Sequence, residues 1–357
     1  MSQYLHSHSR LLLVNTAAKA MSHVVNSAEV KRQDTLRFLQ ALRLQRKMGA
    51  SLVTADSPWS PTLDLLLGTV LPESCAVAVW ERRRAVALAQ MARQSGREQW
   101  EIMHLAIAGV EAHAHSGTDS AHAWLLRLLD EVCRLAGARR ISGIIARVPD
   151  ESCLLASFHQ AGFTATLEEV TYAQASLLVA TAADVLGLRK QEKRDAWPLH
   201  QLYLQSTPQI VQMSEGRTAR DWQVKRSSSR FSFQVKRWVV EDREGLTGWL
   251  SEYPGRRGTM RVQIGVAPGN AKLAQDLVAT AQKHARESGN TGIWSRVPAH
   301  ATDVRQALED GGFVETDRDM VLKRSLAVRV RASAPDREAK RRMARSGLTA
   351  TQSRAWR

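Results

Sequence analysis

Hydrophobic and polar positions follow the same order in two separate parts of the chain. In each part, two β-type apolar runs flank a polar turn, Glu81–Arg84 in the first and Glu241–Gly245 in the second, which is the pattern of a β-hairpin. A third strand is expected after each hairpin. These hairpins and strands lie at 76–92 and 100–108 in the first part and at 235–250 and 260–267 in the second.

A helix is expected after each third strand, because apolar residues then recur at helical spacing. Asp119 or Ser120 can cap the first helix and Gly137 can close it, whereas Asn270 precedes the second helix and Gly289 follows it. The apolar faces consist of Leu125, Leu128, Val132 and Leu135 in the first helix and of Leu273, Leu277, Val278 and Ala281 in the second.

A near-repeat of sequence follows each helix. Residues 144–163 read IIARVPDESCLLASFHQAGF, and residues 293–313 read IWSRVPAHATDVRQALEDGGF. In both, a short apolar strand (141–146 and 291–295) leads into Arg-Val-Pro, a short helix and a Gly-Phe pair before a last strand. A glycine after the helix permits a positive φ, and the phenylalanine can enter the core. The chain therefore contains one α/β unit written twice.

The duplicated pattern divides the chain into domains. Each unit opens with helical sequence, in which Leu36, Leu39 and Leu42 form the apolar positions of the first copy and Leu199, Leu202 and Tyr203 those of the second. The charged run GLRKQEKRD at 187–195 is typical of an exposed linker. We therefore expect a flexible leader at 1–29, a first domain at 30–182, a linker at 183–194, a second domain at 195–325 and a basic tail at 326–357.

Charge and composition narrow the class of protein. The chain has a formal net charge of +15, and residues 323–357 hold eleven Lys and Arg residues against Asp336 and Glu338. No apolar run is long enough for a membrane helix, so we expect no membrane partner. The cysteines, Cys75, Cys133 and Cys153, are scattered without metal-ligand spacing. We therefore expect no metal site and a reducing, cytoplasmic location.

The order of elements, with Gly162-Phe163 and Gly312-Phe313 at the helix exits, resembles the GNAT acyltransferase superfamily over 30–182 and 195–325. The resemblance implies an α/β fold of two tandem GNAT-like domains, each a mixed, mostly antiparallel sheet flanked by helices. It also implies acetyl-CoA or another acyl-CoA as cofactor, bound through its pyrophosphate at the N-terminus of the long helix. Unpaired backbone amides and the helix dipole favour an anion there.

The second copy fits the superfamily's cofactor motif better than the first. The motif has the form Gln/Arg-x-x-Gly-x-Gly/Ala. Its second half is matched by Gly269-Asn270-Ala271, with Val266 where Gln or Arg is usual and Lys272 able to pair with a phosphate. The first copy, HAHSGTDSAH at 113–122, has only Gly117 and places Asp119 near the phosphates. The resemblance thus implies a cofactor site at Val266, Gly269, Asn270, Ala271 and Lys272, and an ordinary capped helix is the alternative for the first copy.

The catalytic positions of the superfamily are altered in both copies. The tyrosine that often serves as general acid is replaced by Phe158 and by Leu308, neither of which donates a proton. The general base is usually a carboxylate on the strand before the cofactor helix, and the titratable residues on that strand are Glu101 and His104 in the first copy. Strand alternation predicts that these two face opposite sides of the sheet. The alternative for Glu101 and for His104 is that each is an ordinary strand residue, solvated or hydrogen-bonded, without a catalytic role.

Other polar residues are candidates in the second copy. Gln263 is the polar residue inside its third strand, and Glu215 and Arg220 lie near its helical entry, where the superfamily often binds acceptors. Exposed charges on a helix are the alternative for the latter pair. Tyr172 could reach a site from the last strand of the first copy, although a half-buried strand tyrosine is the simpler interpretation.

Three functions follow from these features. The first is an acyl-CoA-dependent N-acyltransferase acting on an unidentified amine, with one surviving cofactor site in the C-terminal domain. The second is a non-catalytic double domain that binds RNA or a ribonucleoprotein through residues 332–357, where basic residues and Trp356 could contact phosphates and a base. The third is a domain that binds acyl-CoA without turnover. A basic terminal arm without a partner is the alternative for the tail.

Overall fold

The structure is a computed structural model. It describes residues 25–30, 37, 39–41, 43–44, 74–82, 84–93, 98–110, 119–177, 185–224, 235–243, 245–254 and 258–326. The basic tail at 332–357 lies outside the described residues, so its contact with nucleic acid stays a prediction. Among the helices that are described, none is long and apolar enough to cross a membrane.

The first copy has the expected order of elements. A hairpin of β2 (Ser74–Glu81) and β3 (Arg84–Arg93) is followed by β4 (Gln99–Ile107), and the long helix α4 runs from Asp119 to Ala138. The repeat then supplies β5 (Gly143–Pro149), α5 (Leu155–Gln160) and β6 (Thr164–Gln174). The described residues between 37 and 44 are helical, as the leucine spacing predicts.

The second copy repeats this order. Its opening helices are α6 (Ala196–Ser206) and α7 (Gln209–Glu215), and its hairpin is formed by β8 (Lys236–Glu241) and β9 (Leu246–Pro254). Next come β10 (Thr259–Val266), α8 (Ala271–Glu287), β11 (Gly292–Pro298), α9 (Thr302–Asp310) and β12 (Val314–Ser325). The predicted duplication of an α/β unit is confirmed.

Both Gly-Phe pairs have the expected conformation. Gly162 and Gly312 follow the short helices with φ of +80° and +81°, backbone angles that residues other than glycine rarely adopt. Phe163 and Phe313 are buried in the cores of their copies. The repeated residues therefore meet a backbone requirement of the fold.

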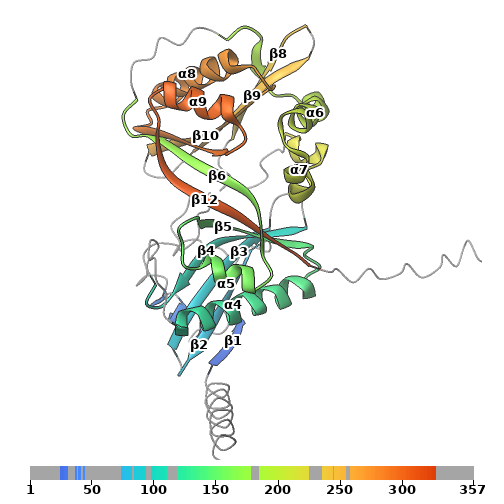
Figure 1. Cartoon of the computed structure of the whole chain (residues 1–357). Helices are drawn as coiled ribbons and strands as arrows, with labels where there is room; N and C mark the ends of the chain where they lie inside the picture. The colour runs from blue at the N-terminus through green and yellow to red at the C-terminus, as the bar shows by residue number, and fades with distance from the viewer. Residues whose placement is uncertain are drawn as a thin grey trace, which may run out of the picture. The chain divides into compact units, whose positions relative to one another are not determined.

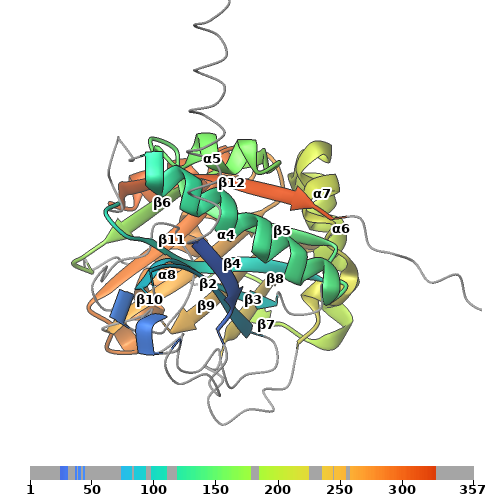
Figure 2. The same cartoon turned by 90° about the horizontal axis from the view of Figure 1, so that it is seen from below.

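The strands of both copies join one continuous sheet of twelve strands, in the order β1-β2-β3-β4-β5-β12-β6-β11-β10-β9-β8-β7. The copies exchange their last strands: β12 of the second copy pairs with β5 of the first, and β6 of the first copy pairs with β11 of the second. Figure 1 shows β6 and β12 crossing side by side between the two sets of strands, and Figure 2 shows the sheet from below. Among the described strands, β4–β5 and β10–β11 are the parallel pairs, so the sheet is mostly antiparallel, as expected.

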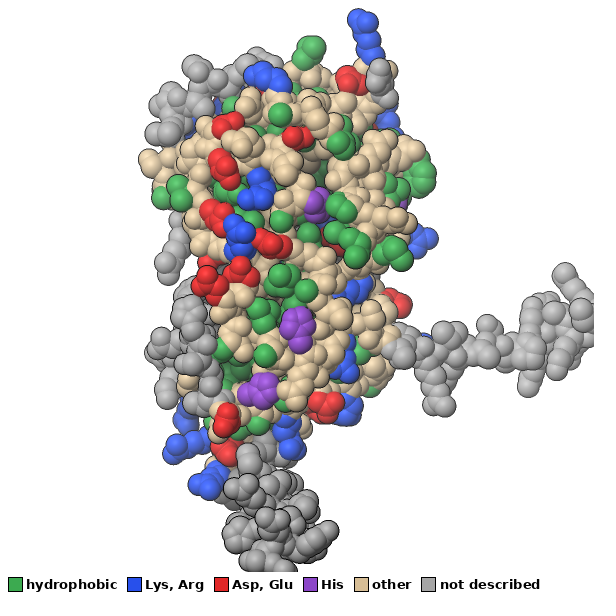
Figure 3. Space-filling view, in the orientation of Figure 1, with side chains coloured by type: hydrophobic (Ala, Val, Ile, Leu, Met, Phe, Trp, Pro, Cys, Tyr) green, Lys and Arg blue, Asp and Glu red, His purple; other side chains and the backbone are tan. Residues whose placement is uncertain are grey.

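Equivalent residues of the two copies meet where the exchanged strands pair. Glu169 of β6 and Asp319 of β12 occupy the same place in the repeat, and they are direct cross-strand partners. Glu169 also pairs with Pro298, and Asp319 pairs with Pro149, so the two Arg-Val-Pro segments border this point. In Figure 3, acidic and basic side chains gather over these strands, where Arg318 forms ion pairs with Glu168 and Glu315.

Two segments expected to lie outside the domains, one in the leader and one in the linker, contain strands that pair with the sheet. Residues 25–29, expected in the leader, form the edge strand β1 (Val25–Glu29), which pairs with β2. The run at 187–195, expected as an exposed linker, forms β7 (Leu188–Lys190) against β8 and a turn of 3-10 helix, Lys193–Asp195. Arg189 holds the buried Asp195 carboxylate there at 2.8 Å. The density of charged residues along the sequence predicted exposure, but it did not show that Arg189 and Asp195 form an ion pair with each other.

Helices cover both faces of the second copy's sheet. A Cβ on Gly248 would touch Leu273 and Leu277 of α8, so alternate residues of β9 face α8 on one side. The opposite face of β9 and β10 carries α6. Trp249 of β9 lies on this second face, beside the cavity described below.

Candidate functional site

The cavity

A cavity opens where β10 and β11 stop pairing. Thr259–Val262 pair with Gly292–Ser295, and no further pair joins the two strands beyond that point. The cavity has a volume of about 330 Å³, and residues from the unpaired parts of both strands line it. Helices α6, α7 and α9 and strand β6 complete its walls. The structure thus provides a groove between separating strands in the second copy.

One end of the cavity lies at the N-terminus of α8. Pro268 and Gly269 line this end, together with Thr302 and Asp303 of α9. Gly269 has a φ of +78°, and open space surrounds the position where a Cβ would stand. Its N–H donates to the Asp303 carboxylate at 2.9 Å. An anion therefore already accepts from one backbone amide of this turn.

The predicted cofactor residues do not all reach the cavity. Val266 and Gly269 line it, whereas Asn270, Ala271 and Lys272 are not among its lining residues. The Lys272 ammonium forms an i,i+4 ion pair with Asp276 at 2.9 Å on the exposed side of α8. The five residues follow one another around the helix entry, and their contact with a cofactor stays a prediction.

Trp249 forms a wall of the cavity because its cross-strand partner is a glycine. Gly265 pairs with Trp249 between β10 and β9, and a Cβ on Gly265 would lie only 2.3 Å from the indole Nε1. The indole therefore lies against the bare backbone of β10. Trp222 contacts Trp249 edge-on, with ring centroids 5.6 Å apart.

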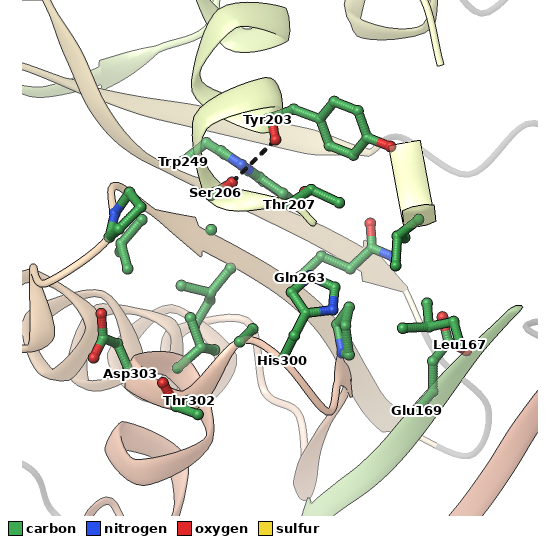
Figure 4. A pocket seen from close by; sticks show the side chains of 18 of the residues that line it. Leu167, Glu169, Tyr203, Ser206, Thr207, Trp249, Gln263, His300, Thr302 and Asp303 are labelled. Carbon is green, nitrogen blue, oxygen red and sulfur yellow. Dashed lines mark hydrogen bonds between the residues drawn. The ribbon is translucent and has the colours of Figure 1, made fainter. Parts of the chain in front are cut away.

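His300 and Gln263 occupy the middle of the cavity, between Asp303 and Glu169 in Figure 4. Burial lowers the pKa of the His300 imidazole below its ordinary value of 6.5, and the Glu215 carboxylate partly opposes this effect. His300 is therefore neutral at pH 7 and able to accept a proton. The Gln263 side chain is oriented by Tyr253, whose hydroxyl donates to its Oε1 at 3.0 Å.

An aromatic and ionic cluster forms the wall opposite β10. The Glu215 carboxylate accepts from the Tyr203 hydroxyl at 2.7 Å and pairs with Arg217, also at 2.7 Å. The Arg217 guanidinium lies 5.3 Å from the Tyr203 ring centroid and 5.7 Å from that of Trp222. Burial by itself would lower the pKa of Arg217, but Glu215, Tyr203 and Glu169 together outweigh burial, so the pKa is raised above its ordinary value. This cluster is charged but internally matched.

The far end of the cavity comes from the other copy. Leu167 and Glu169 belong to β6, the exchanged strand, and both line the cavity. Arg147 of β5 donates from its Nε to Glu169 Oε2 at 2.6 Å and also pairs with Glu101 of β4. One guanidinium of the first copy therefore holds a side chain in the wall of the second copy's cavity.

The predicted catalytic residues of the first copy lie elsewhere. Glu101 is held by Arg147, and His104 is buried on β4; neither lines the cavity. The expectation that they face opposite sides rests on regular alternation, but the β3–β4 register shifts between the pairs Gln90–His104 and Met91–Ile102. Alternation does not hold across such a bulge. Residues 111–118, which include most of the first copy's helix entry, lie outside the described residues.

The positions of the superfamily's tyrosine are core positions here. Phe158 and Leu308 are fully buried, and Phe158 contacts Phe163 edge-on at 5.1 Å. Tyr172 is also fully buried rather than half-buried, and its hydroxyl is held between Glu309 at 2.7 Å and Arg305 at 3.1 Å. Neither Leu308 nor Tyr172 lines the cavity. Burial raises the pKa of the Cys75 thiol to about 12, which leaves no thiolate nucleophile at that position.

Sequence reasoning missed His300 and Glu169 and identified Glu215. His300 is the second residue after the repeated Arg-Val-Pro motif. The first copy has Glu151 at the equivalent position, and this difference between the copies could have drawn attention to His300. Glu169 offered no such signal, because its place in the cavity depends on the strand exchange. Arg220, named beside Glu215, does not line the cavity.

Fit to an acyl-CoA

The cavity and the helix entry fit an acyl-CoA in outline. The separated strands leave unpaired backbone groups along β10, and Gly269 leaves open space at the N-terminus of a seventeen-residue helix. The Asp303 carboxylate is the one lining group near this end that repels a phosphate, and it sits at the first turn of α9, where a rotation of its side chain would release the Gly269 amide. The residues that would hold the group are Val266, Gly269 and the amides that begin α8.

Comparison with known proteins

Solved structures share this fold. A tandem GNAT protein from the clavulanic acid biosynthesis pathway, without acetyl-CoA, matches with a TM-score of 0.51 and 14% identity over 84% of this chain and 98% of that chain. A GCN5-related N-acetyltransferase from Sphaerobacter thermophilus matches with a TM-score of 0.50 and 14% identity, over 84% and 95%. No protein-family model and no curated protein matches the sequence. The chain has a tandem GNAT-like fold, in agreement with the resemblance seen in its sequence.

Proposed function

We propose that this protein is an acyl-CoA-dependent N-acyltransferase whose working site is the cavity of the C-terminal copy. The observation that carries the proposal is the cavity between β10 and β11, which joins the N-terminus of α8 to a wall with a neutral histidine. An acyl-CoA would supply an activated thioester, and an amine would enter from the opposite end.

His300 is the candidate general base. An amine nitrogen loses a proton when it bonds to the thioester carbon, and His300 accepts that proton. The proton passes to the sulfur as the carbon–sulfur bond breaks, so His300 returns to its neutral form. Because Leu308 replaces the superfamily's tyrosine, this route assigns both transfers to one imidazole. The positioning of two reactants in one cavity supplies the remaining advantage.

Titration of acetyl-CoA by calorimetry, followed by a screen of amine acceptors, tests the proposal. We expect saturable binding with one site per chain. Gly269→Asp should abolish binding, because it adds a side chain and a negative charge at the phosphate end of the cavity. Gly289→Asp is the matched control: Gly289 has a φ of +71° with open space around it at the other end of α8.

The outcomes separate clearly. Loss of binding in Gly269→Asp with retention in Gly289→Asp supports the C-terminal site. Equal binding by both variants and the unchanged protein would place the cofactor elsewhere. Absence of binding in the unchanged protein would overturn the proposal and also the interpretation as an acyl-CoA binder without turnover. Transfer to an amine distinguishes the enzyme from such a binder.

A further inference from the structure

The acceptor end of the cavity has a distinct charge distribution. The lining residues include the carboxylates of Glu169, Glu215 and Asp303 against the guanidiniums of Arg217 and Arg296. Arg217 is matched by Glu215 at 2.7 Å, and Arg296 lies 3.8 Å from the buried Asp319 carboxylate behind the wall. Arg217 and Arg296 are therefore each paired with a carboxylate of the protein, so neither favours the binding of an anionic ligand.

Glu169 differs from Glu215 in how its oxygens are used. Oε1 of Glu215 accepts from Arg217 Nη2 at 3.0 Å, whereas Oε2 accepts from the Tyr203 hydroxyl and lies 2.7 Å from Arg217 Nε in an ion pair. Glu169 receives Arg147 on Oε2, whereas its Oε1 has no partner among the described residues. Arg147 also pairs with Glu101, so its charge is divided between two carboxylates. Glu169 thus keeps an acceptor oxygen for the cavity, while its charge also acts on the Arg217 guanidinium in the opposite wall.

The neighbouring walls favour the same kind of ligand. Tyr203, Trp222 and Trp249 line the cavity, and the faces of such rings attract cations. Arg217 already uses the rings of Tyr203 and Trp222 in this way, at 5.3 and 5.7 Å. Figure 4 places His300 between the α8 end and Glu169, so a ligand at Glu169 extends beyond the reacting position.

On the basis of the proposed function, we propose that the acceptor is a diamine. Its reacting amine lies at His300, and its second, charged ammonium is bound by Glu169 Oε1. Glu169 comes from the strand that the first copy lends to the second. The N-terminal copy therefore supplies the residue that selects the substrate, although its own cofactor motif is altered.

Matched amines test this inference. Putrescine and cadaverine are compared with butylamine and pentylamine, which have the same chain lengths and lack the second charge. We expect kcat/KM with acetyl-CoA to favour the diamines by about ten- to a hundredfold, the value of a charged hydrogen bond. Glu169→Gln should remove this preference by raising KM for the diamines more than KM for the monoamines.

Glu168→Gln is the control variant. Glu168 is the preceding residue of β6, pairs with Arg318 on the exposed side and does not line the cavity. We expect it to retain the preference for diamines. Thermal unfolding of both variants, followed by circular dichroism, shows whether loss of the Arg147 pair has altered the fold.

The inference and the proposed function fail in different ways. Equal use of monoamines and diamines, or an equal effect of Glu169→Gln on both, would overturn the assignment of Glu169. If acetyl-CoA does not bind, the proposed function fails, but calorimetric titration of putrescine still decides the inference. Saturable binding that weakens about tenfold or more in Glu169→Gln supports it, and no binding of putrescine overturns it.

Discussion

His300 precedes α9 within the cavity, and its chemistry depends on its burial. Burial lowers the pKa of the imidazole below 6.5, so the side chain is neutral at neutral pH without a charged partner to hold it. Glu215 acts in the opposite direction but is itself engaged by Arg217 and Tyr203. A neutral imidazole in a cavity can take up a proton, whereas the arginines around it cannot.

The pH dependence of the reaction should report His300. The proposed mechanism requires the basic form of His300, so kcat/KM is expected to be constant near neutral pH and to fall as the pH drops through the pKa of His300, below 6.5. His300→Gln should lower kcat by about a hundredfold or more and remove this acid limb. A pH–rate profile of both proteins checks the prediction; an unchanged acid limb in the variant would assign it to another group.

Protonation of His300 also affects stability. Because its pKa in the folded protein is lowered, the folded state disfavours the extra proton, and this contribution to stability is present at neutral pH and lost as the pH falls below the unfolded value of 6.5.

At the scale of elements, the cavity depends on the register between β9 and β10. Gly265 faces Trp249 across these strands, and Gly248 faces α8 on the other side. Gly265 therefore allows the Trp249 indole to lie close to one face of the strand pair, and Gly248 allows α8 to lie close to the other face. The alternation of apolar and polar residues predicted these strands. It did not predict that the Trp249 indole lies on the backbone of Gly265, because this contact depends on the register between the two strands.

Gly265→Ala tests this close contact. A Cβ at 2.3 Å from the Trp249 indole forces the ring to move, so we expect a loss of about 1–3 kcal/mol in the free energy of unfolding and weaker binding of acetyl-CoA. Denaturant unfolding measures the first effect and calorimetry the second. Gly137→Ala in α4 is the control, because nothing lies within 4 Å of its Cβ position; it should stabilise by about 0.5 kcal/mol. Equal effects of the two substitutions would contradict the contact.

At the scale of the whole molecule, the exchanged strands make the two copies dependent on each other. β12 lies between β5 and β6, and β6 lies between β12 and β11. A C-terminal half alone would lack β6 and thus both Leu167 and Glu169 of the cavity. Its β11 and β12 would then expose unpaired strand edges, which favour aggregation.

A chain divided in the segment 178–184 tests this dependence. We expect residues 1–182 and 183–357, when produced together, to purify as a one-to-one complex that binds acetyl-CoA. Each half alone should aggregate or fail to bind. Size-exclusion chromatography and calorimetry provide the measurements, and a folded, monomeric C-terminal half with full binding would contradict the prediction.

Much of the fold was already determined by the sequence. The hairpins, the two long helices, the Arg-Val-Pro strand ends and the positive φ of Gly162 and Gly312 are local properties, set by apolar periodicity and by the conformations that glycine allows. The position of the turn before α8 follows from the same local order. These features predicted a duplicated α/β unit, and their resemblance to the GNAT superfamily implied the tandem fold, without any knowledge of contacts.

The tertiary structure alone decided which strands pair. Pairing of each last strand within its own copy or in the other copy would satisfy the same alternation of apolar and polar residues, so the sequence pattern does not distinguish them. The choice brings Glu169 of the first copy to the cavity of the second. The pairing of β6 with β11 and of β5 with β12 joins residues more than a hundred positions apart, and the periodicity of a sequence does not record which distant strands pair.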